Sequence, residues 1–388
     1  MTIHCDVLEA QAASGLLDEV SRKEADVVER IRTLVSIESP SHSKSAVDDV
    51  QTCFAEWAGS AGGKVLWHPQ REFGDSLEVR FAERRRGQPP IMLLGHLDTV
   101  WNVGTLASMP WRATRDRLAG PGVLDMKSGV VMALTAVEVL QKLQLLRRPV
   151  TMLIHADEEV GSPVSRKLTE TLARRSGAVY VLEPAQGDAG AYKTARKGVG
   201  LYRLTVNGIA AHSGVDFEKG HSAIVELARQ IEVLHSLTDL SKGTTINPGV
   251  IGGGTGSNVV AAEAWVDIDV RVARKQHVSR IDRWLRSLKP FDRACKLTIS
   301  GGMNRPPMER TPGTAALFHR AQKFGAQLGI ALEEAATGGA SDGNFTSALG
   351  VPTLDGMGAV GAGAHATHEH VLRGQLVPRT ALLAAMLL

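Results

Sequence analysis

The sequence predicts an α/β protein: a mostly parallel sheet flanked by helices, with a smaller α+β domain inserted into it. In the first half of the chain, short continuous apolar runs alternate with stretches of helical periodicity, the pattern of a parallel sheet covered by helices. Near Gly198 this pattern changes to longer alternating strands. The chain has 388 residues, more than one hydrophobic core usually supports, so two domains are expected.

Three short apolar runs are typical of strands buried on both faces of a sheet. They cover residues 90–95, 149–156 and 178–182, and residues 76–81 alternate like a further strand. Apolar residues at helical spacing predict helices over 17–35 and 45–61. A third helix is predicted over 129–143, and because it has almost no polar face we expect it to be buried.

The inserted segment has its own order of elements. Strands are predicted over 199–206, 262–272 and 295–300, and helices over 222–236 and 278–288. We interpret this as a strand-helix-strand-strand-helix-strand unit of ferredoxin-like type, with one face of its sheet in solvent. The expected domains are therefore 1–197 with 308–388, and an inserted 198–307. The glycine run at 252–256 is not a phosphate loop, because no GK[ST] follows, and one interpretation of it is an irregular loop.

Composition argues against several classes of protein. The net charge of +3 is small for this length and gives little reason to expect nucleic acid as a partner. Three scattered cysteines form no CxxC pair, so neither a disulfide framework nor a thiolate zinc site is expected. No apolar stretch is long enough to span a membrane, and the first residues lack the basic and apolar segments of a secretory signal. We expect a cytoplasmic protein.

Side chains of the kind that bind metal ions follow three of the predicted strands. They are His96 and Asp98 after the first, Glu158 and Glu159 after the second, and Glu183 after the third. Because ligands collect at the carboxyl ends of parallel strands, these groups are expected to lie near one another. A bare carboxylate at such a position would be costly unless it were paired or bound to a metal.

Two further segments carry groups of the same kind. A glycine-rich turn presents Asp125 just before the buried helix, and a tract near the end contains His365, His368 and His370. Since His96 and Asp98 are two apart, on an extended strand both would point to one face, where the carboxylate would hold the second ring nitrogen of a ligating histidine. Nitrogen and oxygen ligands without cysteine suit zinc in an open, catalytic site.

The chain resembles the family of zinc-dependent exopeptidases and deacylases that includes glutamate carboxypeptidase, acetylornithine deacetylase, succinyl-diaminopimelate desuccinylase and aminoacylase. The matching motifs are GHLDTV at 95–100, GPGVLDMKSG at 120–129, DEEVGS at 157–162, LEP at 182–184 and HATHE at 365–369, in the family order and with similar spacing. The inserted segment matches as well, so the resemblance covers most of the chain.

The resemblance implies a role for each matching residue. Asp125 would bridge two zinc ions, for which cobalt or manganese are substitutes. The other ligands would be His96 and Glu183 at one ion, and Glu159 and His365 at the other. Asp98 would be the partner of His96, and Glu158 the general base that activates zinc-bound water to hydroxide.

The histidine tract allows two assignments of the metal ligand, His365 or His368. His365 stands four residues before Glu369, as a histidine does in the family, so His368 and His370 are interpreted as bystanders. The alternative is that His368 is the ligand, in which case its loss, and not the loss of His365, would remove a metal ion.

In the inserted domain the resemblance implies contacts with substrate. His212 would stabilise the oxyanion, reaching in from a partner subunit of a homodimer formed through this domain. Asn258 and Arg305 would hold a substrate carboxylate, which the planar fork of an arginine binds bidentately, and Arg271 is an additional candidate. The alternative is that these residues have only structural roles.

These inferences predict a metal-dependent hydrolase that cleaves an amide or peptide bond next to a free carboxylate, with a small peptide or an N-acyl amino acid as substrate. A neighbouring alternative is an N-acyl-amino-acid deacylase of the acetylornithine deacetylase or succinyl-diaminopimelate desuccinylase type. A different-class alternative is a non-catalytic scaffold with the same fold. Such a scaffold is expected to have a broken ligand set, and all five ligand positions are intact in this sequence.

Overall fold

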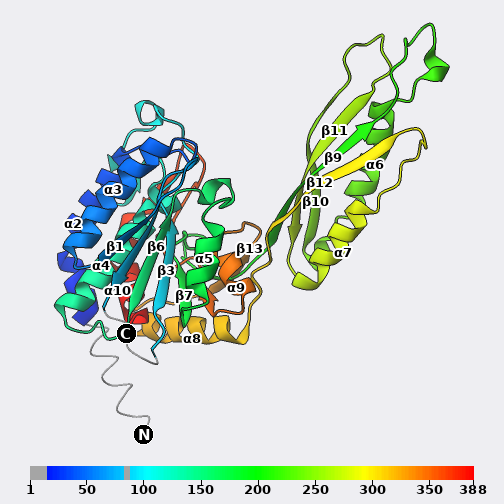
Figure 1. Ribbon diagram of the computed structural model, residues 1–388. Coiled ribbons are helices and arrows are strands. Elements are labelled where there is room, and N and C mark those ends of the chain that lie inside the picture. The colour runs from blue at the N-terminus through cyan, green and yellow to red at the C-terminus, as the bar shows by residue number, and fades with distance from the viewer. Residues whose placement is uncertain (1–14, 83–87) are drawn as a thin grey trace. The chain divides into compact units, whose positions relative to one another are not determined.

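The computed structural model describes residues 15–82 and 88–388, so the first residues, for which no secretory signal is predicted, lie outside the described residues. Contacts divide the chain into two compact units (Figure 1). The larger unit comprises the described residues up to Thr194, together with Arg310–Ala336 and Ser341–Leu388. The smaller unit comprises Ala195–Glu309 together with Thr337–Ala340, a short second passage of the chain that the sequence patterns did not indicate.

A six-stranded sheet forms the centre of the larger unit, in the order β1-β2-β6-β3-β7-β14. Its strands are β1 (Lys64–His68), β2 (Ser76–Phe81), β3 (Ile91–His96), β6 (Val150–His155), β7 (Ala178–Val181) and β14 (Thr353–Leu354). β3 pairs in parallel with both β6 and β7, and β7 pairs in parallel with β14. β2 runs antiparallel to both of its neighbours. The sheet is therefore mostly parallel, which confirms the predicted class.

Helices cover both faces of this sheet because its central strands are apolar on both sides. Ile91 and Leu93 of β3 belong to the larger core, together with residues of α4 (Ser128–Lys142). Met92 and Leu94 face the other way and share a second core with Leu172 of α5 (Arg166–Ala173). Most of α4 is buried, as its lack of a polar face predicted.

The other helices described in the larger unit are α2 (Glu24–Ser36), α3 (Lys44–Ser60), α8 (Pro312–Gln327), α9 (Gly343–Ala348) and α10 (Leu376–Met386). The helix expected over 17–35 is interrupted, because residues 15–22 are helical, Lys23 is a turn and α2 follows. α10 packs against α4 and α8. Across the described residues, no helix combines the length and the hydropathy that crossing a membrane requires.

A small four-stranded sheet brings the end of the chain beside the segment that precedes α4. Its strands are β4 (Arg112–Ala113), β5 (Arg117–Ala119), β15 (Gly361–Ala362) and β16 (His370–Leu372), in the order β15-β16-β5-β4. His370 of β16 pairs with Ala119 of β5. Because Asp125 follows β5 closely and His365 lies between β15 and β16, this sheet brings the two side chains into one region. A separate two-stranded sheet pairs β8 (Tyr192–Arg196) with β13 (Glu334–Thr337).

The smaller unit contains two α-helices and a second, antiparallel sheet. In chain order its elements are β9 (Gly198–Asn207), α6 (Ala223–His235), β10 (Thr244–Gly253), β11 (Glu263–Val272), α7 (Lys275–Arg286) and β12 (Lys296–Arg305). The sheet order β10-β11-β9-β12 is that of a ferredoxin-like unit, as predicted. α6 and α7 pack against this sheet, whose Val266, Ile268 and Val270 are buried in the core beneath them. On the opposite face, Arg203 and Asp267 form an ion pair.

The structure corrects the interpretation of the glycine run at 252–256 as an irregular loop for its first two residues, whereas residues 254–256 are irregular. Gly252 and Gly253 are the last residues of β10 and pair with Trp265 and Ala264 of β11. A Cβ atom on Gly252 would lie 2.7 Å from the Trp265 ring, and one on Gly253 would lie 2.6 Å from the Cβ atom of Ala264. Glycine is needed here because the neighbouring strand approaches closely.

Candidate metal centre

Three of the predicted ligands lie at the carboxyl edge of adjacent parallel strands. His96 is the last residue of β3. Glu159 lies in η3 (Glu158–Val160), a short helix that begins soon after β6 ends, and Glu183 follows β7. Because β6, β3 and β7 are neighbours in the sheet, their carboxyl ends bring these side chains together, as the strand pattern predicted.

The other two predicted ligands come from irregular segments. Asp125 belongs to η2 (Val123–Lys127), the turn that leads into α4, and its backbone there is not helical. His365 lies in the turn between β15 and β16 and has a positive φ of 62°, a backbone conformation that few residues other than glycine adopt. The small sheet of the larger unit holds both segments side by side.

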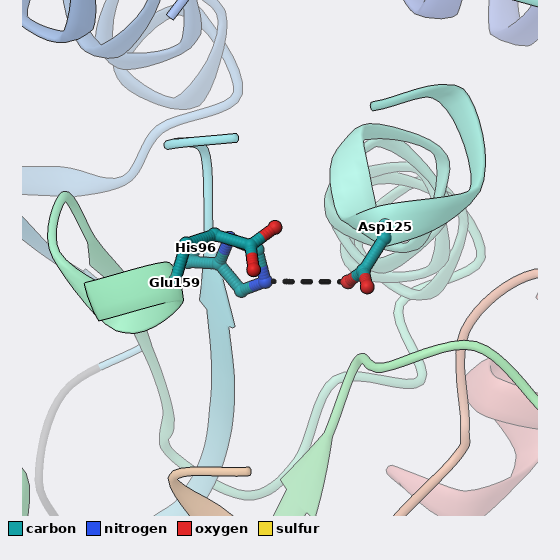
Figure 2. Close-up of side chains that lie close together, drawn as sticks. All are labelled: His96, Asp125 and Glu159. Atoms are coloured by element: carbon teal, nitrogen blue, oxygen red, sulfur yellow. Dashed lines mark ion pairs between the residues drawn. The ribbon is translucent and has the colours of Figure 1, made fainter. Parts of the chain in front are cut away.

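Asp125 lies between two imidazoles, with one carboxylate oxygen toward each. Its Oδ1 atom is 3.4 Å from the Nε2 atom of His96, and its Oδ2 atom is 3.4 Å from the Nε2 atom of His365. Glu183 completes the first group, with Oε1 3.7 Å from the His96 Nε2 atom, and Glu159 completes the second, with Oε2 3.2 Å from the His365 Nε2 atom. Figure 2 shows His96 and Glu159 facing Asp125 across a small gap.

These separations suit shared metal ions better than direct hydrogen bonds. Two ligand atoms that each lie about 2 Å from a tetrahedral ion are about 3.3 Å apart. Buried atoms at the centre, His96 Nε2, Asp125 Oδ1 and Glu159 Oε1, have no hydrogen-bond partner in the described part of the protein. Because a buried polar atom without a partner is costly, this donor set fits a pair of divalent cations.

Glu158 lies beside the same centre. Its carboxylate, with ligand atoms of His96 and Glu183, forms one of two groups whose atoms lie within 4.8 Å of one another; His96, Asp125 and Glu159 form the other. Glu158 is buried at the start of η3. The structure thus brings the predicted base close to the predicted ligands.

Asp98 contacts His96, but not in the way that strand alternation predicted. β3 ends at His96, so Asp98 lies beyond the strand. The His96 Nδ1 atom is 2.9 Å from the backbone carbonyl oxygen of Asp98 and 3.4 Å from its carboxylate. That carboxylate accepts hydrogen bonds from the hydroxyl of Ser41 and from the backbone N–H groups of Glu158 and Glu159. Asp98 therefore connects His96 to η3, which carries Glu158 and Glu159. Ser41 is a member of the site that sequence reasoning missed.

The charges around the centre shift the pKa values of its members. Burial lowers the pKa of His96, but the carboxylates of Asp125, Asp98 and Glu183 outweigh it and hold this pKa well above its ordinary value. Asp125 and Glu159 raise the pKa of His365 to about 10. Burial raises the pKa of Glu159 to about 7, although His365 opposes this. The site therefore holds protons where a cation would otherwise balance its carboxylates.

The histidine tract presents one imidazole to the carboxylates. Both His365 and His368 are exposed, but of these two described residues only His365 forms ion pairs with Asp125 and Glu159. His370 belongs to β16, and its Nδ1 atom is 2.9 Å from the carbonyl oxygen of His368. This geometry favours the assignment of His365 as the ligand.

The four predicted substrate contacts all belong to the smaller unit. His212 and Asn258 are exposed and lie on neighbouring segments, since the N–H of Ser213 donates to the carbonyl oxygen of Asn258. Arg305 is buried at the end of β12. Arg271 uses its guanidinium for two hydrogen bonds to Asp269, of 2.8 and 2.9 Å.

A model of peptidase family M20/M25/M40 matches residues 92–388. The chain belongs to this family. It is 27% identical over 312 residues to carboxypeptidase G2 of Pseudomonas sp. (strain RS-16), a match that covers 78% of this chain and 74% of that protein. It is also 27% identical over 337 residues to succinyl-diaminopimelate desuccinylase of Delftia acidovorans, covering 78% of this chain and 83% of that protein.

A solved structure supports the fold of this M20 chain. It is that of the YXEP protein of Bacillus subtilis, described as a dinuclear metal-binding peptidase of the M20 family. The TM-score is 0.69 at 13% identity, over 95% of this chain and 98% of that one. The chain is a metallohydrolase of family M20, and the side chains around Asp125 are its candidate metal centre.

Proposed function

We propose that this M20 enzyme hydrolyses an amide or peptide bond next to a free carboxylate, in the manner of a glutamate carboxypeptidase, with two zinc ions. The observation that carries the proposal is the placement of Asp125, whose two oxygens face two separate imidazoles at equal distances of 3.4 Å. A carboxylate in that position is suited to bridge two cations.

Each cation would have its own ligands besides Asp125. His96 and Glu183 would hold one, and His365 and Glu159 the other, as their distances from one another allow. Three carboxylates would balance most of the charge of two dications. When bound, the pair of ions would lower the pKa of a water molecule and polarise the carbonyl group of the substrate.

Glu158 is the proposed general base. It is buried beside the ligand atoms of His96 and Glu183, where it would accept a proton from the attacking water and deliver it to the leaving nitrogen. Asp98 would keep the His96 ring oriented, through the carbonyl and carboxylate oxygens that face Nδ1. The same Asp98 carboxylate holds the backbone of Glu158, so it also orients the base.

The smaller unit would supply recognition of the substrate. Arg305 would bind the free carboxylate through both arms of its guanidinium, and Asn258 would add a hydrogen bond. His212 would donate to the carbonyl oxygen as negative charge develops on it. Arg271, whose guanidinium pairs bidentately with Asp269, would be an additional contact.

A panel of substrates tests this proposal. The zinc-loaded protein would be assayed with dipeptides and N-acyl amino acids that differ in acyl group and side chain, each with a partner in which the free carboxylate is amidated. We expect kcat/KM to fall by at least tenfold on amidation, because Arg305 would lose its anion. Equal rates for both members of every pair would contradict the proposal.

The same panel separates the carboxypeptidase from a deacylase. The similarity to succinyl-diaminopimelate desuccinylase is the observation that favours this second candidate. Highest kcat/KM on acetylated or succinylated diamino acids would support the deacylase, and highest kcat/KM on peptides with a C-terminal glutamate would support the carboxypeptidase.

We also propose a homodimer formed through the smaller unit. The sheet edge at β10 exposes Val250 and Ile251, and α6, which packs on β10, exposes Ile224 and Val225. Exposed apolar side chains next to an unpaired strand edge are typical of an interaction surface. Light scattering after size-exclusion chromatography should show a dimer, and Val225→Lys should shift it toward the monomer. A monomeric wild-type chain would contradict this part.

A further inference from the structure

The buried carboxylate of Glu369 is not one of the proposed ligands, but it accepts four hydrogen bonds, one of them from the backbone of Asp125. Its Oε1 atom accepts from the backbone N–H groups of Leu124, at 2.8 Å, and Asp125, at 3.1 Å. Its Oε2 atom accepts from the backbone N–H of Gly122 and from the indole N–H of Trp101, each at 3.0 Å. The residue is 1% exposed.

The donors to Glu369 come from segments that carry proposed ligands. Gly122 and Leu124 precede Asp125 at the start of its turn, and Asp125 donates through its own backbone. Trp101 follows β3, which ends in His96. Glu369 itself comes soon after His365 in the chain. A single carboxylate thus joins the segments of three ligands.

The Asp125 turn needs such external support. The turn is irregular at Asp125, and its Gly122 and Leu124 are buried, so leaving their backbone N–H groups unpaired would be costly. From the other side, Lys127 anchors the same turn by donating to the carbonyl oxygens of Leu34 and Ile37 at the end of α2, at 2.9 and 2.8 Å. The turn is therefore held between Glu369 and α2.

We propose that Glu369 is a positioning residue of the metal centre: it fixes the Asp125 turn relative to the His96 and His365 segments before any ion binds. Charge-assisted hydrogen bonds from backbone N–H groups are short and directional, so they hold the Asp125 backbone in one place. Without them, binding an ion would first have to order that turn, and metal affinity would fall by the cost of ordering.

The test compares Glu369→Gln with His368→Ala, a change at the exposed neighbouring residue. Each oxygen of Glu369 accepts two donors, so the amide nitrogen of glutamine would face two N–H groups in either orientation. Zinc affinity would be measured by competition with a chromophoric chelator, at a temperature where circular dichroism shows each variant folded. We expect Glu369→Gln to weaken zinc binding at least tenfold and His368→Ala to leave it unchanged.

Hydrogen exchange separates positioning from a merely structural role. In the metal-free protein, Glu369→Gln should speed exchange at the amides of Gly122, Leu124 and Asp125 while the amides of β3 and β6 keep wild-type rates. Equal acceleration throughout the larger unit, or wild-type zinc affinity in folded Glu369→Gln, would overturn the proposal. The inference rests on the proposed metal ligands, but both readouts are independent of substrate, so the proposed substrate can be wrong without affecting them.

A second variant covers the case in which Glu369→Gln does not fold. Trp101→Phe removes one of the four donors and keeps an aromatic ring of similar shape. We expect zinc affinity to fall about threefold with little change in the thermal midpoint of unfolding, because the three backbone donors remain. Unchanged zinc affinity in Trp101→Phe, together with unchanged exchange at Gly122, would count against the positioning role.

Discussion

The Oδ2 atom of Asp125 lies 3.4 Å from the Nε2 atom of His365, although the two residues come from distant parts of the sequence. The contact exists because β5 and β16 pair and bring the two segments together. Since the other oxygen of Asp125 faces His96, one carboxylate stands between both halves of the candidate centre.

This arrangement predicts the metal content of three variants. Asp125→Ala should lose both ions, because each would lose its shared ligand, whereas Glu183→Ala and Glu159→Ala should each lose chiefly one. Elemental analysis after dialysis against trace zinc would measure the content. The wild-type protein should hold about two ions per chain and lose them to a chelator. Two tightly bound ions in Asp125→Ala would rule out its bridging position.

Glu158→Ala should keep its metal and lose its activity. Removal of a general base typically lowers kcat by about 10²–10⁴-fold, and the proposed ligands would remain in place. Elemental analysis and kcat on the best substrate of the panel would be measured on the same sample. Activity above a tenth of the wild-type value would remove Glu158 from this role.

The histidine tract offers a matched pair of substitutions. His365→Ala should lose one ion and most activity, because His365 contacts both Asp125 and Glu159. His368→Ala should resemble the wild-type protein, since in the described residues His368 pairs with neither carboxylate. Metal loss in His368→Ala with full metal content in His365→Ala would show that His368, and not His365, is the ligand.

The pKa of His365 predicts how metal binding depends on pH. Asp125 and Glu159 raise this pKa to about 10 in the metal-free protein, whereas an ion binds the neutral imidazole. Zinc binding should therefore release a proton from His365, and affinity should rise with pH across the neutral range. Titration calorimetry in buffers of different ionisation enthalpy would count the protons. In His365→Ala the number released should fall, and an unchanged number would contradict the assignment.

The same shift affects the stability of the metal-free protein. A raised pKa means that the folded state holds this proton more tightly than the unfolded chain, whose histidine has an ordinary pKa of 6.5. The contribution is complete below that value and is lost as pH rises toward about 10. In urea unfolding after chelation, the stability difference between wild type and His365→Ala should therefore shrink between pH 6 and pH 9.

The two arginines of the smaller unit should differ in their effect on substrate binding. Arg305→Lys keeps the charge but loses the bidentate fork, so KM should rise at least tenfold while metal content stays constant. Arg271→Lys is the matched comparison at the additional candidate, whose guanidinium pairs with Asp269. Steady-state kinetics on one substrate would measure KM for both variants. A larger rise in KM for Arg271→Lys would make Arg271, and not Arg305, the main contact with the carboxylate.

By itself, the sequence determined the α/β class, the ferredoxin-like insertion and the side chains that gather at the candidate centre. Apolar runs such as 90–95 define strands locally, and chemical groups placed at strand ends converge because parallel neighbours end at one edge. Only the tertiary structure decided which imidazole of the histidine tract faces Asp125, that Asp98 lies beyond its strand, and that β10 extends through Gly252 and Gly253. It alone revealed Ser41 and Glu369 as supports. Those features depend on contacts between segments far apart in the chain, and no local pattern of residues encodes such contacts.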